Sequence, residues 1–322
     1  MTIETEAVLD RRRLRRRLSL WRVLAVTAGA LALGALTYVG AGAPGFGERD
    51  QIARVTIDGV IGEDRAQLQM LKRIAEASHV KAVIVFINSP GGTATGGEAL
   101  YEALRNVSKA KPVVAQFGTV ATSAAYMAGI AADHIVARGN TITGSVGVIW
   151  QWPEVTQLLE KLGVKMNAIT SGPLKANPNP YQPLDAAGRQ VVEQMVAESQ
   201  KWFLGLVATR RSLATATVPG LEQGRVFTGR DALTLKLIDA IGDEGDAVNW
   251  LVTKKGIAKT LKVVDWKPKR DVQFGPWRLA IEAVGRFFGG ATGELAASLA
   301  DDPRVAALRL DGLIALWLPI EK

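Results

Sequence analysis

The stretch AVIVFINSPGG, residues 82–92, decides the fold of this chain. Ala82–Asn88 is a continuous apolar run of the kind found in strands that are buried on both faces, and the glycines after Pro90 allow a sharp backbone turn. A buried strand that ends in such a turn is typical of an α/β domain with a largely parallel sheet. The turn can expose N–H groups that bind a phosphate or stabilise an oxyanion; an ordinary tight turn is the alternative.

Strand and helix patterns alternate around this run. Strands are predicted at 52–61, 82–88, 112–117, 134–137, 146–150 and 165–170, and helices at 65–77, 98–107, 122–132, 153–162 and 185–211. The alternation predicts one α/β domain over residues 51–265. Residues 268–322 form a basic and then apolar tail, with apolar residues at helical spacing from Trp277 to Phe288. We expect an amphipathic helix there that packs on protein or lies on a membrane.

The composition excludes several kinds of chemistry. The chain has 322 residues, 33 of them glycine, and is 48% hydrophobic, which argues against disorder. It has no cysteine, which excludes disulfides, thiol catalysis and thiolate metal sites. Its two histidines, His79 and His134, are too few for a histidine-rich metal centre and are interpreted as structural. We therefore predict neither a metal nor a cofactor.

The net charge of +8 is concentrated at the N-terminus. Residues 1–22 contain seven arginines and carry +4, and residues 23–47 contain no charge. A basic run can bind nucleic acid, but one followed by an apolar segment predicts a transmembrane anchor at residues 23–43. The positive-inside rule then places residues 1–22 in the cytoplasm and the α/β domain on the extracytoplasmic, periplasmic side of the inner membrane. A signal peptide cleaved after Ala41-Gly42-Ala43 is the alternative.

A second candidate spot is GTVATSAAY, residues 118–126, where a predicted strand runs into a predicted helix. Ser123 lies near the start of that helix. It is either a nucleophile or an ordinary helix N-cap.

A third spot is the loop TSGPLKANP, residues 170–178, in which Lys175 is the only charge between Lys165 and Asp185. A lysine amine that is buried without a carboxylate partner can be neutral and accept a proton, whereas a solvated loop lysine cannot. Since neither histidine is suitably placed to serve Ser123, a serine–lysine dyad is the economical option for hydrolysis.

The order of these motifs resembles the signal peptide peptidase A (protease IV) family of membrane-bound serine–lysine peptidases. Gly92 precedes Ser123 by 31 residues, and Lys175 follows it by 52. The resemblance covers about residues 51–265 and rests on these segments: INSPGG (87–92), AADHIVARGNTITGSVGVI (131–149), the lysine loop, and GRVFTGRDALTLKLID (224–239).

The resemblance implies a crotonase/Clp-like α/β fold of stacked ββα units, preceded by one transmembrane helix. It implies Ser123 as the nucleophile, Lys175 as the general base, and backbone N–H groups of Gly91 and Gly92 near the oxyanion. Ser145, in TGSVGVI, matches the family serine that orients the lysine amine.

The chain carries one copy of the motif set, which within the family implies the short form: a homo-oligomeric ring with the dyad completed between neighbouring subunits. Its implied partners are membrane lipid and apolar peptides such as released signal peptides. The sequence departs from the family pattern at two places, and both concern substrate specificity. Ala124 and Ala125 replace family glycines and are expected to narrow the space beside Ser123, and Pro173-Leu174 replaces a more polar stretch.

Two other functions stay open at this point. One is a catalytically inactive membrane scaffold of the same fold. The other is an acyl-CoA hydratase or isomerase, which would use the glycine N–H groups for a thioester enolate. The predicted anchor and the serine–lysine pair argue against the second.

Overall fold

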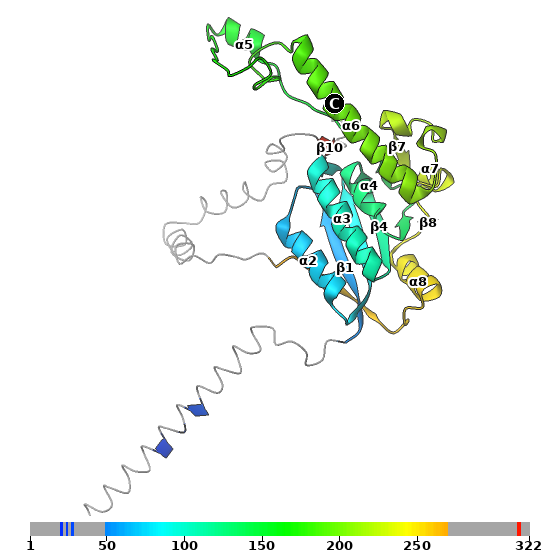
Figure 1. Ribbon diagram of the computed structural model, residues 1–322. Helices are drawn as coiled ribbons and strands as arrows, with labels where there is room; N and C mark the ends of the chain where they lie inside the picture. The colour runs from blue at the N-terminus through cyan, green and yellow to red at the C-terminus, as the bar shows by residue number, and fades with distance from the viewer. Residues whose placement is uncertain (1–19, 22–23, 25–26, 29–48, 270–313, 317–322) are drawn as a thin grey trace, which may run out of the picture. The chain divides into compact units, whose positions relative to one another are not determined.

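The computed structural model describes residues 20–21, 24, 27–28, 49–269 and 314–316 (Figure 1). The chain divides into residues 1–49 and 50–322. Of the predicted anchor, residues 23–43, only Leu24, Thr27 and Ala28 are described, and the predicted tail helix lies outside the described residues. Among the residues that are described, no helix has the length and apolar character needed to cross a bilayer.

The elements of the α/β body alternate largely as the sequence predicts. The strands are β1 Gln51–Asp58, β2 Val80–Ser89, β3 Gly91–Thr93, β4 Val113–Thr122, β5 His134–Ala137, β6 Ile142–Gly144, β7 Val226–Thr228, β8 Ala240–Ile241, β9 Lys262–Trp266 and β10 Ile314–Leu316. The α-helices are α2 Arg65–Glu76, α3 Ala94–Ala110, α4 Ala124–Gly129, α5 Thr156–Lys161, α6 Ala186–Arg211, α7 Gly229–Thr234 and α8 Glu244–Lys255.

The main sheet has the order β7-β6-β4-β2-β1-β9, and β5 and β8 extend it beside β4. Its pairs are parallel except β6 with β7. One edge of β4 pairs with β2, and the other edge pairs first with β5 and then with β6. The carboxyl ends of β2 and β4 therefore lie side by side, where parallel sheets usually carry their sites. These two ends carry the SPGG turn and Ser123.

Apolar side chains cover both faces of the central strands. One face packs against α2, α3 and α4, which lie in front of the sheet in Figure 1. On the other face Ile52, Ile84 and Val114 pack with Leu251 of α8. Burial on both faces explains the uninterrupted apolar run in β2, since each such side chain contributes about 1.5–3 kcal/mol when fully buried.

Three element predictions are wrong. The helix predicted at 122–132 is only Ala124–Gly129, because β4 continues to Thr122 where it pairs with β6. The strand predicted at 146–150 is absent, and β6 lies just before it at Ile142–Gly144. The strand predicted at 165–170 is also absent: those residues are all exposed, and no described strand pairs with them.

Candidate active site

Ser123 lies at the turn where β4 passes into α4, and its backbone is strained. Its φ of 57° and ψ of −120° fall in a region that residues other than glycine rarely adopt. Two backbone hydrogen bonds hold the turn. The Ser123 N–H donates to the Gly144 carbonyl at 2.8 Å, and the Met127 N–H donates to the Ser123 carbonyl at 2.9 Å. Strain of this kind persists only where the surrounding structure fixes the backbone, as it does here.

The Ser123 hydroxyl is buried but weakly bonded. It makes no capping hydrogen bond to α4, so the alternative of an ordinary N-cap is wrong. Among the described residues it hydrogen-bonds only to the Gly147 carbonyl, at 3.5 Å, the limit for such a bond. A hydroxyl with so little competition for its proton and lone pairs is available for reaction.

Ser123 belongs to a group of buried hydroxyls around this turn. The buried serine and threonine side chains of the described residues are Ser89, Thr122, Ser123, Thr141 and Thr143. The three threonine hydroxyls each donate to a backbone carbonyl, at 2.7–3.0 Å. They satisfy backbone groups that would otherwise be buried without a partner. The sequence signal for them is a set of hydroxyl residues inside small, apolar strands.

Asn88 fixes the part of β4 that leads to Ser123. Between Ile87 and Ser89 the pairing of β2 with β4 skips two residues of β4. The Asn88 Oδ1 atom accepts hydrogen bonds from the N–H groups of Thr119 and Val120, at 3.1 and 3.4 Å. The amide thus fixes the irregular part of β4 three residues before Ser123. Sequence reasoning quoted this asparagine in its motif but assigned it no role.

The two glycines form a short strand rather than a plain turn. A Cβ on Gly92 would lie 1.8 Å from the Ile61 carbonyl oxygen, so only glycine fits there. The Ile61 N–H donates to the Gly91 carbonyl at 2.8 Å, and the Thr93 N–H donates to the Ile61 carbonyl at 2.9 Å. The Gly91 N–H donates to Ser89 Oγ at 3.1 Å. Ile61 thus occupies one edge of this strand. Of the two N–H groups predicted to bind an oxyanion, only that of Gly92 points to the opposite edge.

Ser145 lies close to Ser123 along the backbone. It follows Gly144, whose carbonyl accepts from the Ser123 N–H, and it has its own positive φ of 52°. Its N–H donates to the Arg225 carbonyl at 2.9 Å. Gly144 is therefore held against Ser123 by a backbone hydrogen bond, and Ser145, the next residue, is held by its own bond to Arg225.

Ala124 and Ala125 are fully buried. Ala124 packs on α3, where a Cβ added to Gly97 would lie 2.9 Å from the Ala124 Cβ. The methyl group of Ala124 therefore fills the core between α4 and α3. The expectation that it narrows the substrate space beside Ser123 finds no support in this packing.

The surroundings of Lys175 differ from those of Ser123, Ser145 and the glycines. It is exposed, and its N–H donates to the Gly172 carbonyl at 3.1 Å. It belongs to residues 151–185, here called the lysine arm, which extend beyond the sheet and its helices together with the start of α6 (Figure 1). No hydrogen bond joins Lys175 to Ser123 or Ser145 within the described part of the chain. The single chain thus brings together Ser123, Ser145 and the glycines, but not the lysine.

The lysine arm is anchored to α6 close to Lys175. Asp185 is the N-cap of α6, and its Oδ1 accepts from the Gly188 N–H at 2.7 Å. That backbone hydrogen bond, and a second from the Asn177 side chain, lower the pKa of Asp185. Asn177 also fills the space at Gly188, where an added Cβ would lie 2.4 Å from its Oδ1. The loop that carries Lys175 is therefore fixed to the rigid helix two residues later.

Apolar side chains are exposed along the lysine arm and just before it. Of the sixteen large apolar side chains that are exposed among the described residues, eight lie between 149 and 181. They are Ile149, Leu158, Leu162, Val164, Met166, Ile169, Leu174 and Tyr181. Clustered exposure of this kind marks a surface that contacts another molecule.

Both histidines have structural surroundings. His134 stacks on Trp250 with ring centroids 4.6 Å apart, and His79 stacks on Trp266 at 6.0 Å. Burial lowers the pKa of His134, although the nearby Asp239 carboxylate acts in the opposite direction. Both rings thus stack on tryptophan side chains, which is a structural environment.

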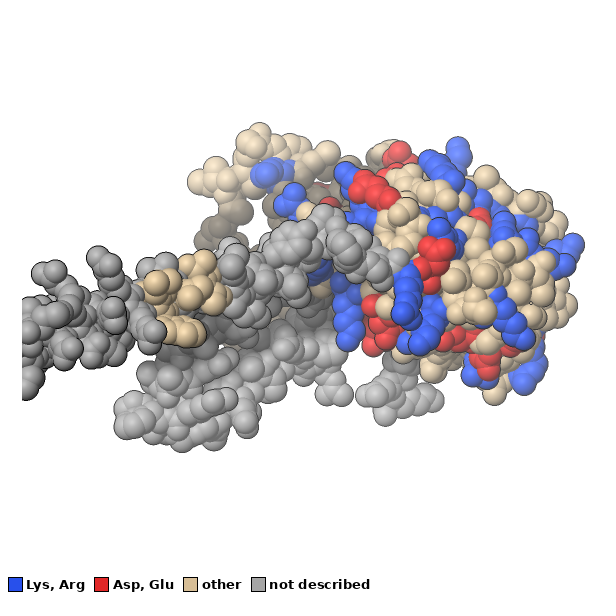
Figure 2. Space-filling view, turned by 90° about the horizontal axis from the view of Figure 1, so that it is seen from below, with Lys and Arg blue, Asp and Glu red and all other residues tan. Residues whose placement is uncertain are grey.

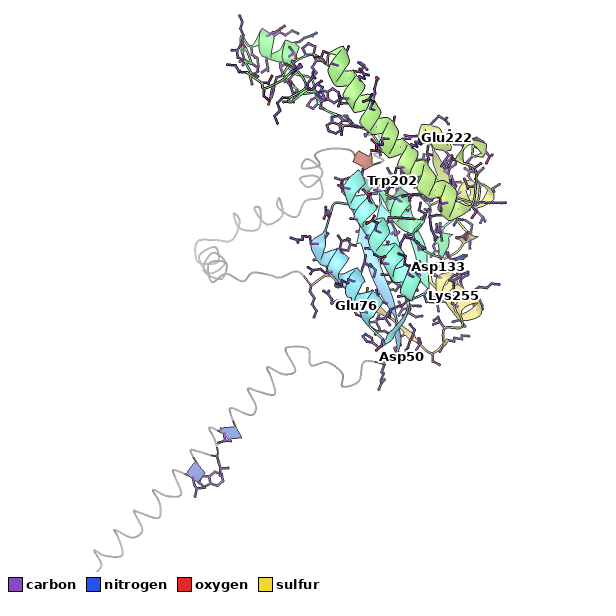
Figure 3. All side chains as sticks on the ribbon, in the orientation of Figure 1. Asp50, Glu76, Asp133, Trp202, Glu222 and Lys255 are labelled. Carbon is purple, nitrogen blue, oxygen red and sulfur yellow. The ribbon has the colours of Figure 1, made fainter. Side chains whose placement is uncertain are left out.

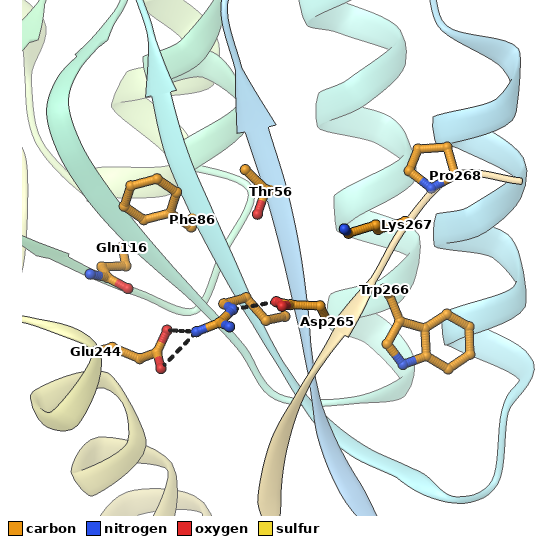
Figure 4. A pocket seen from close by; sticks show the side chains of 9 residues that line it. Thr56, Phe86, Gln116, Glu244, Asp265, Trp266, Lys267 and Pro268 are labelled. Carbon is orange, nitrogen blue, oxygen red and sulfur yellow. Dashed lines mark hydrogen bonds and ion pairs between the residues drawn. The ribbon is translucent and has the colours of Figure 1, made fainter. Parts of the chain in front are cut away.

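A separate hollow of about 520 Å³ lies over β1, β2 and β4 (Figure 4). Its centre is Arg54, which donates to both oxygens of Glu244 at 3.0 and 2.8 Å and also pairs with Asp265. These carboxylates raise the pKa of Arg54. Because Glu244 and Asp265 neutralise the guanidinium, Arg54 is not available to an anion, and the hollow contains none of the predicted site residues. Around the body, basic and acidic side chains are interspersed on the face seen in Figure 2.

Comparison with known proteins agrees with these features. Residues 105–258 match Peptidase family S49, and residues 52–139, from β1 to β5, match the Clp protease family. The chain is 36% identical to "Putative protease slr0021" of Synechocystis over 211 residues, which cover 65% of this chain and 76% of that protein. It is 35% identical to Protease 4 of Haemophilus influenzae over 198 residues, or 60% of this chain and 32% of the relative.

A third relative is the chloroplastic serine protease SPPA of Arabidopsis thaliana, at 31% identity over 67% of this chain and 34% of that protein. The chain therefore spans about a third of each of the two longer relatives. The matched segments begin in a parallel sheet whose β2, β3 and α3 form one ββα unit, so the fold is a Clp-protease-like α/β fold. On these matches the chain belongs to the signal peptide peptidase A family, peptidase family S49, and is a peptidase.

Proposed function

We propose that this chain is a membrane-anchored serine endopeptidase with a Ser123–Lys175 dyad. It hydrolyses apolar peptides, such as released signal peptides, on the extracytoplasmic side of the cytoplasmic membrane. The observation that carries the proposal is the Ser123 hydroxyl. The residue is 1% exposed, is held in a strained turn and makes no side-chain capping bond, and the hydroxyl of the preceding Thr122 donates to the carbonyl of Pro90, just before the Gly91–Thr93 strand.

The base comes from a neighbouring subunit. Lys175 is exposed in the single chain, on an arm whose apolar side chains are also exposed. An arm of this kind is stabilised by packing on a second copy, which removes water from both the apolar side chains and the lysine. A ring-like homo-oligomer would then bring Lys175 of one subunit to Ser123 and Ser145 of the next.

The reaction follows from these groups. The neutral amine of Lys175 accepts the Ser123 hydroxyl proton while Oγ attacks the peptide carbonyl carbon, and the carbonyl oxygen becomes an oxyanion. The Gly92 N–H stabilises that oxyanion. When the C–N bond breaks, the lysine ammonium gives its proton to the leaving amine, and an acyl ester remains on Ser123. Water, deprotonated by the same amine, then hydrolyses the ester and regenerates the serine. Ser145 orients the amine.

The location and substrate rest on the sequence. Seven arginines before an uncharged segment support an anchor at residues 23–43, with lipid as a partner and residues 1–22 in the cytoplasm. The α/β domain would then meet peptides released at the outer face of the membrane. We propose residues 51–265 as the peptidase domain and 268–322 as a tail that packs on protein.

The test is hydrolysis of a synthetic signal peptide by the detergent-solubilised full chain. Ser123→Ala and Lys175→Ala should each lower turnover by about 10³-fold or more, since residues that act as a unit are not additive. Lys175→Arg should not restore it, because a guanidinium stays protonated. Lys165→Ala, another exposed lysine of the same arm, is the matched control and should keep full activity.

Two outcomes would contradict the proposal. Substantial activity in Lys175→Ala, with Ser123→Ala inactive, would show that a different base is used. Failure of a fluorophosphonate probe to label Ser123 in the unaltered full chain, together with no hydrolysis, would favour the inactive scaffold.

A further inference from the structure

Two buried hydroxyls hold one peptide unit beside the nucleophile. Thr122, the residue before Ser123, donates its hydroxyl proton to the Pro90 carbonyl at 3.0 Å. Ser89 Oγ accepts from the Gly91 N–H at 3.1 Å. This carbonyl and this N–H are the two ends of the same planar peptide unit. Thr122 and Ser89, here called the hydroxyl clamp, therefore bond that unit at both ends.

The clamp lies where the backbone leaves the main sheet. The last pair between β2 and β4 joins Ser89 to Ala121. The chain then turns at Gly91, whose φ of 109° is a conformation that glycine adopts readily and other residues do not. Because glycine opposes rotation of the backbone less than any other residue, the peptide unit before it needs other groups to fix its orientation. The two hydroxyls are placed to do so.

Both hydroxyls of the clamp are shielded from water and from charge. Ser89 and Thr122 are each 0% exposed, and no charged side chain is fully buried among the described residues. Charged side chains such as Glu76, Asp133 and Lys255 lie on the outside of the body (Figure 3). Since no solvent replaces a lost hydroxyl at such a position, its removal leaves a peptide group unpaired.

The next peptide unit carries the Gly92 N–H, the proposed oxyanion donor. The other end of that unit, the Gly91 carbonyl, accepts from the Ile61 N–H at 2.8 Å and from the Ser89 hydroxyl at 3.4 Å. The two units share the Gly91 Cα atom, so rotation of the first changes the direction of the second. The direction of the Gly92 N–H therefore depends on the clamp.

We propose that Thr122 and Ser89 are positioning residues, which hold the Gly92 N–H at a fixed place relative to Ser123 Oγ. The inference rests on the proposed function for the reaction that these groups serve. Thr122 is adjacent to Ser123 and bonded to the oxyanion segment, so one side chain links the attacking atom to the donor. Because the oxyanion exists only in the transition state, a displaced donor lowers kcat and leaves KM nearly unchanged.

The test measures kcat and KM for hydrolysis of a synthetic signal peptide by the detergent-solubilised full chain. Thr122→Val replaces the hydroxyl by a methyl group and should lower kcat about tenfold, with KM within about twofold. Thr122→Ser keeps a hydroxyl and should restore kcat to within about threefold. Thr141→Val is the matched control. It removes a buried hydroxyl that bonds the Gly118 carbonyl and the Arg138 N–H, and it should keep kcat within about twofold.

A double-mutant cycle tests whether the two hydroxyls hold the same unit. Ser89→Ala releases the N–H end and should also lower kcat about tenfold. Because either substitution frees the same peptide unit, Ser89→Ala with Thr122→Val should lower kcat about tenfold as well, rather than about a hundredfold.

Amide hydrogen exchange supplies a readout that needs no peptide. The Gly91 N–H should exchange about tenfold faster in Thr122→Val, because the far end of its peptide unit is released. The Thr93 N–H, bonded to the Ile61 carbonyl, is the internal reference and should keep its rate. Thr141→Val should change neither rate.

Four results would each overturn the inference: an unchanged kcat in Thr122→Val, an equal loss in Thr141→Val, additive losses in the double variant, or an unchanged Gly91 exchange rate. Failure of the proposed function looks different. The unaltered chain would then hydrolyse no peptide, while the exchange rates would still report whether the two hydroxyls hold this peptide unit.

Discussion

Ser123 and Lys175 lie in regions that differ in burial: the first is in the packed body and the second is on the exposed lysine arm. Ser123 lies at the centre of the body, 1% exposed, with hydrogen-bonded backbone on every side. Lys175 lies on the lysine arm, where the residues around it are exposed and its neighbours include apolar side chains such as Leu174 and Ile169. The fold of one chain sets the position of Ser123, whereas under the proposed function a second copy that covers the arm sets the position of Lys175.

This difference has a physical basis. A strained serine needs many surrounding contacts to hold it, and only a core supplies them. A lysine that acts as a base needs removal from water, which an exposed arm can obtain from a second copy. Assembly would then switch the base on, and an isolated chain would be inactive.

The largest effect is expected from mixing two inactive chains. When Ser123→Ala and Lys175→Ala are co-expressed, each supplies the group that the other lacks, provided that the dyad forms between subunits. Random assembly should restore about a quarter of the unaltered activity. The measurement is peptide hydrolysis by the purified mixture. Co-expression of Ser123→Ala with the double variant is the control and should stay inactive. If the mixture is as inactive as its components, the dyad lies within one chain.

Substitution of one glycine in the body and one in the lysine arm tests how tightly the backbone of each region is packed. Gly92→Ala puts a Cβ 1.8 Å from the Ile61 carbonyl oxygen, whereas at Gly172 in the lysine arm nothing lies within 4 Å of an added Cβ. Gly92→Ala should lower kcat/KM by about 10²-fold, as loss of an oxyanion donor does, and should lower the urea midpoint. Gly172→Ala should change the free energy of unfolding by less than about 0.5 kcal/mol. Similar effects at both positions would remove the distinction between body and arm.

The sequence predicted the body far better than the arm, for the same reason. The run Ala82–Asn88 and the helix predicted at 65–77 depend on local apolar pattern, and both appear within two residues at each end. The strand predicted at 165–170 requires a neighbouring strand, which no described segment supplies. A pattern of alternating apolar residues indicates that a segment will be covered, but not by which molecule.

Within the candidate site, the sequence predicted which residues come together better than it predicted their hydrogen bonds. Ser123 and Ser145 were found by motif, and the backbone brings them together through Gly144. That the Gly91 N–H is occupied by Ser89 could not be read from SPGG, because it depends on a side-chain rotamer. The roles of these residues in catalysis stay predictions.

Substitution of one tyrosine in the body and one in the lysine arm compares the contribution of their hydroxyl groups to stability. Tyr126 is fully buried, burial raises its pKa, and its hydroxyl donates to the Leu237 carbonyl at 2.9 Å. Tyr126→Phe leaves that buried carbonyl unpaired and should lower the free energy of unfolding by about 1–3 kcal/mol. Tyr181 in the lysine arm is 50% exposed. Tyr181→Phe should therefore change the free energy of unfolding by less than about 0.5 kcal/mol. Urea unfolding of both variants checks this. A larger loss for Tyr181→Phe would mean that the arm is packed in solution.

The smallest effect concerns His134, which gives the body a pH dependence that the lysine arm, having no histidine, cannot contribute. Burial lowers the pKa of His134 in the folded chain; Asp239 raises it and Arg211 lowers it further. The unfolded chain, with a histidine pKa of about 6.5, therefore binds the proton more strongly. This contribution to stability is fully present above about pH 6.5 and is lost as pH falls towards the folded-state value.

His134→Gln removes the titrating group and keeps a polar side chain of similar length. The free energy of unfolding of the unaltered chain should fall more steeply from pH 7 to pH 5 than that of the variant, by less than about 1 kcal/mol over the range. Urea unfolding at four pH values measures both slopes. The comparison is made between slopes because the lost stacking on Trp250 shifts the variant's stability at every pH alike. Equal slopes would show that His134 binds its proton as strongly in the folded chain as in the unfolded one, and the burial argument would fail.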